Sequence, residues 1–105
     1  MQVIKRVNVG QRLSDMAIYN GVAYLAGQVP DDVTQDIAGQ TAQVLNTIDK
    51  LLAEAGSNKS RILLAQIYVA NMKEFDEGNA PPRATIEARL ANADFKVEIV
   101  VTAAV

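Results

Sequence analysis

The sequence contains neither cysteine nor histidine among its 105 residues. Without cysteine, the chain has no disulfide, no thiol nucleophile and no thiolate ligand for a metal. Without histidine, it lacks the most common general base and the most common metal ligand in proteins. These two absences exclude Ser-His-Asp catalysis and ordinary zinc chemistry.

Runs of positive charge and long apolar runs are also missing. The net charge is -2, so nucleic acid and anionic membranes are poor candidates for partners. No stretch approaches the length of a membrane span, and residues 1–6 lack the apolar core of a signal peptide. We therefore expect a cytoplasmic protein without a membrane or nucleic-acid partner, and its length predicts one domain over residues 1–105.

The first half of the chain carries strand signals. Asn20-Gly21 predicts a tight hairpin between strands at residues 16–19 and 22–26, because a type I′ turn needs positive φ at both central positions. Residues 3–9 alternate apolar with polar side chains and include two cations, which is typical of an exposed edge strand. These segments predict an antiparallel start to a sheet.

Apolar residues at helical spacing follow. They predict a helix over residues 34–55 with one apolar face, begun by a cap at Thr34 or Asp36 and ended at Gly56. Residues 61–70 are apolar on both sides, as expected for a central strand that is covered on both faces. This pattern places the helix across a sheet.

The C-terminal part predicts two more strands. Residues 83–90 and 95–105 both alternate apolar with polar side chains, which favours an antiparallel hairpin with a turn at residues 91–94. In that register one side is continuously apolar and forms core, and Glu87 lies directly across from Glu98. The other side of the hairpin is charged.

This charged side is a candidate for an oligomer interface that carries a site. Arg83 and Glu87 are about 13 Å apart along a strand, so one subunit cannot easily bring Arg83 and Glu98 onto one small ligand, whereas a second subunit can. On residue chemistry alone, an exposed strand cation paired with an acid on the same face is the simpler explanation of Arg83.

The segment between the strands predicted at residues 61–70 and 83–90 is short for a covering helix. Residues 72–77 can begin a helix, yet Gly78 and the prolines Pro81 and Pro82 stop it within two turns. A sheet with one long helix normally has a second helix over its remaining apolar area.

Several motifs together resemble the Rid (YjgF/YER057c/UK114) family, whose founding members are enamine/imine deaminases. The resemblance covers almost the whole chain. The specific part is an arginine in an Arg-small-small-aliphatic string that stands 15 residues before a glutamate between aliphatic residues, as Arg83 and Glu98 do. The strings that carry the resemblance are Gly27-Gln28-Val29-Pro30, Ala55-Gly56, Ile67-Tyr68-Val69, Pro82-Arg83-Ala84-Thr85-Ile86 and Val97-Glu98-Ile99.

This resemblance implies an α+β fold in which a single mixed sheet of about six strands is backed by two helices. It implies a homotrimer, similar to trimeric chorismate mutases, with clefts between subunits. The implied reaction hydrolyses 2-imino acids, such as 2-iminopropanoate and 2-iminobutanoate, to 2-keto acids and ammonia. No metal and no organic cofactor is implied.

The resemblance also assigns residues to the site. Arg83 holds the substrate carboxylate through a bidentate pair, for which guanidinium geometry is well suited. Glu98 orients the water or transfers a proton at the imine carbon. Backbone groups at Gly27 and Ala84 complete the pocket, and Thr85 lines it.

Four positions depart from the family pattern. Leu13 stands where the family has a tyrosine, Ala26 where it has a serine and Thr85 where it has a cysteine. Asn92 falls near the position of the family's proline in the turn between the last two strands. These changes favour an alternative, a non-catalytic small-carboxylate binding or regulatory protein on the same trimeric scaffold. A structural or chaperone-like oligomer is a third hypothesis. A chorismate mutase is a fourth, which rests on fold analogy alone.

A larger departure lies between Glu77 and Gly78. About 11 residues of the family's second helix, or three turns at 3.6 residues per turn, have no counterpart there. Either the chain lacks them or a segment has been left out of the sequence. The apolar sheet that such a loss uncovers, at about 25 cal/mol per Å², favours the second explanation.

Overall fold

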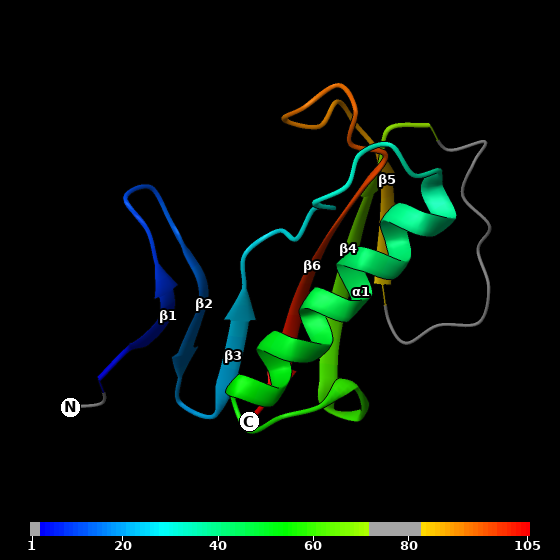
Figure 1. The fold of residues 1–105 in the computed structure, drawn as a ribbon. Coiled ribbons are helices and arrows are strands. Elements are labelled where there is room, and N and C mark those ends of the chain that lie inside the picture. Colours follow the sequence, from blue (N-terminus) through cyan, green and yellow to red (C-terminus); the bar gives the residue numbers. More distant parts are fainter. Residues whose placement is uncertain (1–2, 72–82) are drawn as a thin grey trace.

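The structure is a computed structural model that describes residues 3–71 and 83–105. Within these ranges, six strands form one mixed sheet with one long helix packed across it (Figure 1). The strands are β1 (Lys5–Val9), β2 (Ser14–Tyr19), β3 (Val22–Leu25), β4 (Ile62–Val69), β5 (Arg83–Glu87) and β6 (Val97–Ala104). The helix is α1 (Ile37–Glu54), and a short 3₁₀ turn at Lys59–Arg61 precedes β4. The predicted α+β class and mixed sheet are confirmed.

The strands lie side by side in the order β1-β2-β3-β6-β4-β5. β4 and β5 run parallel, and the other neighbouring pairs run antiparallel. β1 lies at one edge of the sheet, as its cations Lys5 and Arg6 predict. β4 lies between β6 and β5, as predicted for residues 61–70. The expectation that both of its faces are covered is not met among the described residues, where Leu64 is 48% exposed.

The predicted hairpin between residues 83–90 and 95–105 is wrong. β5 pairs in parallel with β4, and β4 separates it from β6. Glu87 therefore does not face Glu98, whose partner on β4 is Tyr68. The physical reason is that β4 is apolar on both faces and gains a ladder partner on each of its edges by lying inside the sheet.

The turn between β2 and β3 has the predicted geometry. Asn20 and Gly21 both have positive φ, at 52° and 78°. The strands pair antiparallel directly from Tyr19 and Val22. Because only glycine and, less readily, asparagine adopt this conformation at low cost, the dipeptide sets the register of the hairpin.

Helix α1 begins slightly later than residues 34–55 predict. Its cap is Asp36, whose carboxylate accepts a hydrogen bond of 2.9 Å from the Gly39 amide. Thr34 instead donates its hydroxyl to Asp32, at 2.6 Å. At the other end, Gly56 has the predicted left-handed conformation, with φ 77°. The second of the two proposed caps is therefore the correct one.

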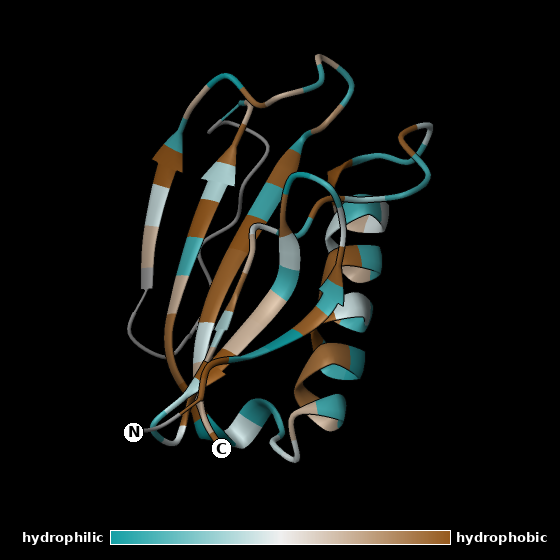
Figure 2. Ribbon diagram, turned by 90° about the vertical axis from the view of Figure 1, so that its left-hand side faces the viewer, coloured by the Kyte–Doolittle hydropathy of each residue, from teal (hydrophilic) through white to brown (hydrophobic). Residues whose placement is uncertain are grey.

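The core lies between α1 and one face of the sheet. Alternate side chains of β6 are buried there and half-buried on the opposite face. The buried side chains contributed by α1 and β6 are Val44, Ile48, Leu51, Leu52, Val97, Ile99, Val101 and Ala103. Figure 2 shows α1 lying along one side of the sheet, and among the described residues no helix covers the other side. We call that other side the open face.

The open face carries exposed apolar side chains from three strands: Tyr24 on β3, Leu64 on β4 and Ile86 on β5. Each is between 42% and 52% exposed. Exposed apolar side chains on a sheet face that no described helix covers favour an interaction surface there. The helix predicted to begin at residues 72–77 lies outside the described residues. Among the residues described, no helix is long and apolar enough to cross a membrane.

Candidate functional site

Glu98 lies on the open face, next to the middle of the sheet. Its neighbours Val97 and Ile99 point to the core and are at most 5% exposed, so strand alternation directs Glu98 to the opposite side. There it is half-buried. Tyr68 of β4 is its cross-strand partner.

Gly27 lies against the Glu98 carboxylate. It belongs to the segment after β3, where Gln28 forms an isolated bridge with Ile99 of β6. A Cβ atom added to Gly27 would come within 2.8 Å of the Glu98 carboxyl carbon and closer still to Oε2. The structure therefore brings two of the predicted site residues into contact.

The Glu98 carboxylate has no hydrogen-bond or ion-pair partner within residues 3–71 and 83–105. A carboxylate that is half-buried and unpaired keeps its oxygens available to accept a proton or a hydrogen bond from water. This is the chemistry that the sequence analysis assigns to Glu98.

Arg83 lies elsewhere in the sheet. It is the first residue of β5 and pairs with Ala65, which in turn pairs with Val101 of β6. Two strand spacings and three residues of strand therefore separate its backbone from that of Glu98, about 14 Å at the usual dimensions of a sheet. Its side chain is not among those the structure describes. One subunit thus holds the two residues apart. The reason is the position of β4 between β5 and β6, and not the hairpin register on which the expectation rested.

The two residues after Arg83 lie on different faces. Ala84 pairs with Gln66, which pairs with Val100, so it belongs to the open face with Glu98. Thr85 pairs with Ile67, which packs against the core. Thr85 is therefore not on the Glu98 side of the sheet in its own subunit, because adjacent strand residues point to opposite faces.

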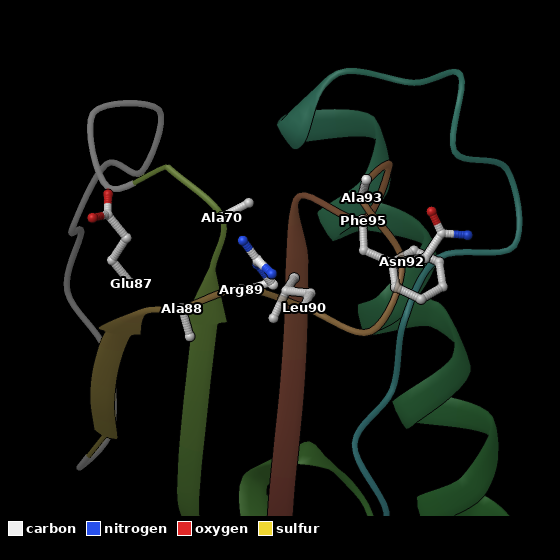
Figure 3. A pocket seen from close by; sticks show the side chains of 8 residues that line it. All are labelled: Ala70, Glu87, Ala88, Arg89, Leu90, Asn92, Ala93 and Phe95. Atoms are coloured by element: carbon white, nitrogen blue, oxygen red, sulfur yellow. The ribbon is translucent and has the colours of Figure 1, made fainter.

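A cavity of about 430 Å³ lies at the other end of β5, and none of the predicted site residues lines it. Arg89 projects into it between the ends of β4 and β6, whereas the Glu87 carboxylate points away (Figure 3). Phe95 and Asn92 form another wall. The sequence does not predict this cavity, because its lining depends on the position of β5 beside β4.

Gln40 connects the loop before α1 with the loop before β6, the strand that carries Glu98. It is fully buried. Its carbonyl accepts a 2.8 Å hydrogen bond from the Lys96 amide, and its Nε2 donates to the carbonyls of Asp94, Val33 and Gln35. No sequence motif marks this residue. Its helical spacing from Ile37 and Val44, on the buried face of α1, is the signal that could have found it.

The loop before α1 has a charged hydrogen-bonded turn. The Asp32 carboxylate accepts hydrogen bonds from the Thr34 hydroxyl, the Thr34 amide and the Gln35 side chain. These bonds lower the pKa of Asp32 below its usual value, and the bond from the Thr34 hydroxyl has the largest effect. This group is fully exposed, so we assign it to loop structure. No cluster of three acidic side chains that could hold a metal ion occurs in the described part of the chain.

Comparisons with known proteins identify the family. The model described as endoribonuclease L-PSP matches residues 3–105. A RutC family protein from Haemophilus ducreyi is 54% identical over 98% of this chain and 97% of its own length. The chain belongs to the Rid family. Its members of known structure include NMB1025 of Neisseria meningitidis, a YjgF family protein with TM-score 0.87, 37% identity, and coverage of 97% of this chain and 94% of that one.

A second solved structure carries the family name itself. YyfA of Yersinia pestis, described as a protein of unknown function of the conserved Rid family, has TM-score 0.79 and 32% identity, with coverage of 92% of this chain and 90% of its own. These likenesses extend over nearly the full length of each chain. They support the family and the fold of this Rid protein.

This Rid protein is shorter than its H. ducreyi relative. Their alignment runs over 114 positions and takes in 98% of the 105 residues here, which leaves about 11 positions filled by the relative alone. The number agrees with the predicted shortening between Glu77 and Gly78, which lies outside the described residues.

Proposed function

We propose that this Rid protein is an enamine/imine deaminase that hydrolyses small 2-imino acids, such as 2-iminopropanoate and 2-iminobutanoate, to 2-keto acids and ammonia. The observation that supports it most is the half-buried carboxylate of Glu98, which lies against Gly27 on the open face and has no partner among the described residues. A net charge of -2 and the absence of histidine argue against RNA hydrolysis as the activity of this chain.

In the proposed reaction, Glu98 accepts a proton as a water oxygen attacks the imine carbon. The protonated Glu98 gives this proton to the imine nitrogen, and the product of attack is a carbinolamine. Glu98 then takes the hydroxyl proton and passes it to the nitrogen as the C–N bond breaks, so that ammonia leaves and a ketone forms. One water is consumed and the base is regenerated. A positioned proton-transfer group of this kind contributes about 10² to 10⁴ in rate.

Arg83 binds the carboxylate of the substrate. Guanidinium offers two parallel N–H donors to a carboxylate, which fixes orientation as well as position. Because about 14 Å of sheet separates the Arg83 and Glu98 backbones of one subunit, we propose that they meet across an interface between two subunits.

The open face supports such an interface. Its exposed apolar side chains, Tyr24, Leu64 and Ile86, come from β3, β4 and β5, and burying them against a second copy is favourable by about 25 cal/mol per Å². We propose a homotrimer, following the family resemblance, with sites in the clefts between subunits.

The test is a coupled assay. A dehydratase or amino-acid oxidase generates the 2-imino acid, semicarbazide traps it, and the Rid protein competes by hydrolysis. Wild type should suppress the semicarbazone, whereas Arg83→Ala should lose suppression and remain oligomeric. Arg89→Ala is the matched control and should behave as wild type. Full activity of Arg83→Ala would contradict the assignment.

A second candidate function is binding of a small carboxylate without catalysis. One observation favours it: the cavity at the end of β5 offers the Arg89 guanidinium, which has no hydrogen-bond or ion-pair partner in the described part of the chain, and has the apolar Phe95 on another wall. Calorimetric titration with 2-oxobutanoate separates the two candidates. Binding that Arg89→Ala abolishes and Arg83→Ala retains, with no deamination, would support this second function.

A further inference from the structure

The Gly27 backbone is anchored on both sides. On one side, the Ala26 amide donates a 2.8 Å hydrogen bond to the carbonyl of Asp15. On the other side, Gln28 exchanges two backbone hydrogen bonds with Ile99, at 2.9 and 3.1 Å. Gln28 is also buried, and its side-chain amide donates back to the Ala26 carbonyl. The segment is therefore not free to move away from β6.

Gly27 does not need to be glycine for its backbone conformation. The described glycines with positive φ are Gly21 and Gly56, and Gly27 is not among them. An alanine can adopt the backbone conformation of Gly27 without strain. The site has no room for an alanine side chain, because the Cβ would overlap the end of the Glu98 side chain.

From these two observations we infer that Gly27 is a positioning residue whose missing side chain makes the space in which the Glu98 carboxylate sits. Its contribution to the site is thus distinct from any contact that its backbone makes with substrate. As a role in catalysis, this inference rests on the proposed deaminase function. As a statement about where the carboxylate lies, it does not.

A Cβ at Gly27 would displace whichever neighbouring group can move at the lowest cost. The backbone on both sides of Gly27 is hydrogen-bonded to its neighbours, whereas Glu98 ends in a flexible side chain without a partner in the described residues. A Cβ at Gly27 would therefore turn the carboxylate to another rotamer and leave the fold intact, since side-chain rotamers differ by far less energy than a broken sheet bridge.

The experiment compares Gly27→Ala, Glu98→Ala and the double variant in the coupled assay. Gly27→Ala should lower kcat by about 10²-fold, as expected when a proton-transfer group is displaced, with little change in KM. The double variant should be no slower than Glu98→Ala. A wild-type rate for Gly27→Ala, or a further loss in the double variant, would overturn the inference.

Gly39→Ala is the matched control. The Cβ that it adds would also meet a side chain, that of Gln35, at 2.7 Å from Oε1 and 2.8 Å from Cβ, but on the first turn of α1. Its activity should equal that of wild type. This control separates the position of Gly27 from a general effect of adding a methyl group.

A crystal structure of Gly27→Ala tests the inference independently of activity. It should show an unchanged bridge between Gln28 and Ile99 and a Glu98 carboxylate displaced to a different rotamer. If the carboxylate stays in place, the inference fails even in an active deaminase. If it moves in a protein that shows no deamination, the inference about Gly27 holds and the proposed function fails.

Discussion

The two halves of the proposed site are held by different parts of the sheet. Glu98 is on β6, which has a strand on each side and buried neighbours in sequence. Arg83 begins β5, an edge strand with one partner in the described sheet. The group that must be placed accurately for proton transfer thus lies inside the sheet, and the group that binds a charge lies at an edge that a second subunit can complete.

The largest expected difference is in the loss of unfolding free energy when an isoleucine is changed to alanine on β6 and on β5. Ile99→Ala removes a side chain that is 5% exposed and should cost about 2 to 5 kcal/mol of unfolding free energy. Ile86→Ala on β5 removes one that is 42% exposed and should cost less than about 1 kcal/mol in the subunit.

Chemical unfolding measures both values. Sedimentation should in addition show weaker self-association for Ile86→Ala, because it lies on the open face. Equal losses of stability for the two variants would remove the distinction between β6 and β5.

A smaller effect is expected at Gln40, which anchors the start of β6. Gln40→Ala leaves the Lys96 amide without this acceptor and three carbonyls without this donor. Leaving a buried polar group unpaired costs about 1 to 3 kcal/mol, so we expect a loss of about 2 kcal/mol. The Lys96 amide should also exchange faster with deuterium.

Gln43→Ala is the control on the same helix. Its side chain binds the amides of Asp31 and Asp32 in an exposed loop, where water can replace it, so the loss should stay below about 1 kcal/mol. A Gln43→Ala loss as large as that of Gln40→Ala would show that burial is not what makes Gln40 important.

The smallest effect concerns Asp32, which is remote from both halves. Because hydrogen bonds from Thr34 and Gln35 lower the pKa of Asp32, its small stabilising contribution is present above the unfolded-state pKa and is lost as pH falls through the folded one. NMR titration of the carboxyl carbon should give a midpoint below that of a model peptide. Thr34→Ala should raise the midpoint, and an unchanged midpoint would contradict the assigned cause.

Local features of this chain could be predicted from residues close in sequence. Asn20-Gly21 specifies its turn through positive φ, Asp36 and Gly56 bound the helix, and the alternation of β6 separates its buried face from Glu98. Each depends on conformational preferences or on a period that a short segment contains. The family and its sheet were also predictable, from motifs spread along the chain.

The position of β5, the cavity beside Arg89, the role of Gln40 and the contact of Gly27 with Glu98 came only from the tertiary structure. Each joins residues that are distant in sequence, and alternation alone is equally compatible with several strand orders. The residue types of this proposed site could therefore be predicted from the sequence. Which of them meet depends on strand pairing and packing, because those bring together atoms that no local pattern connects.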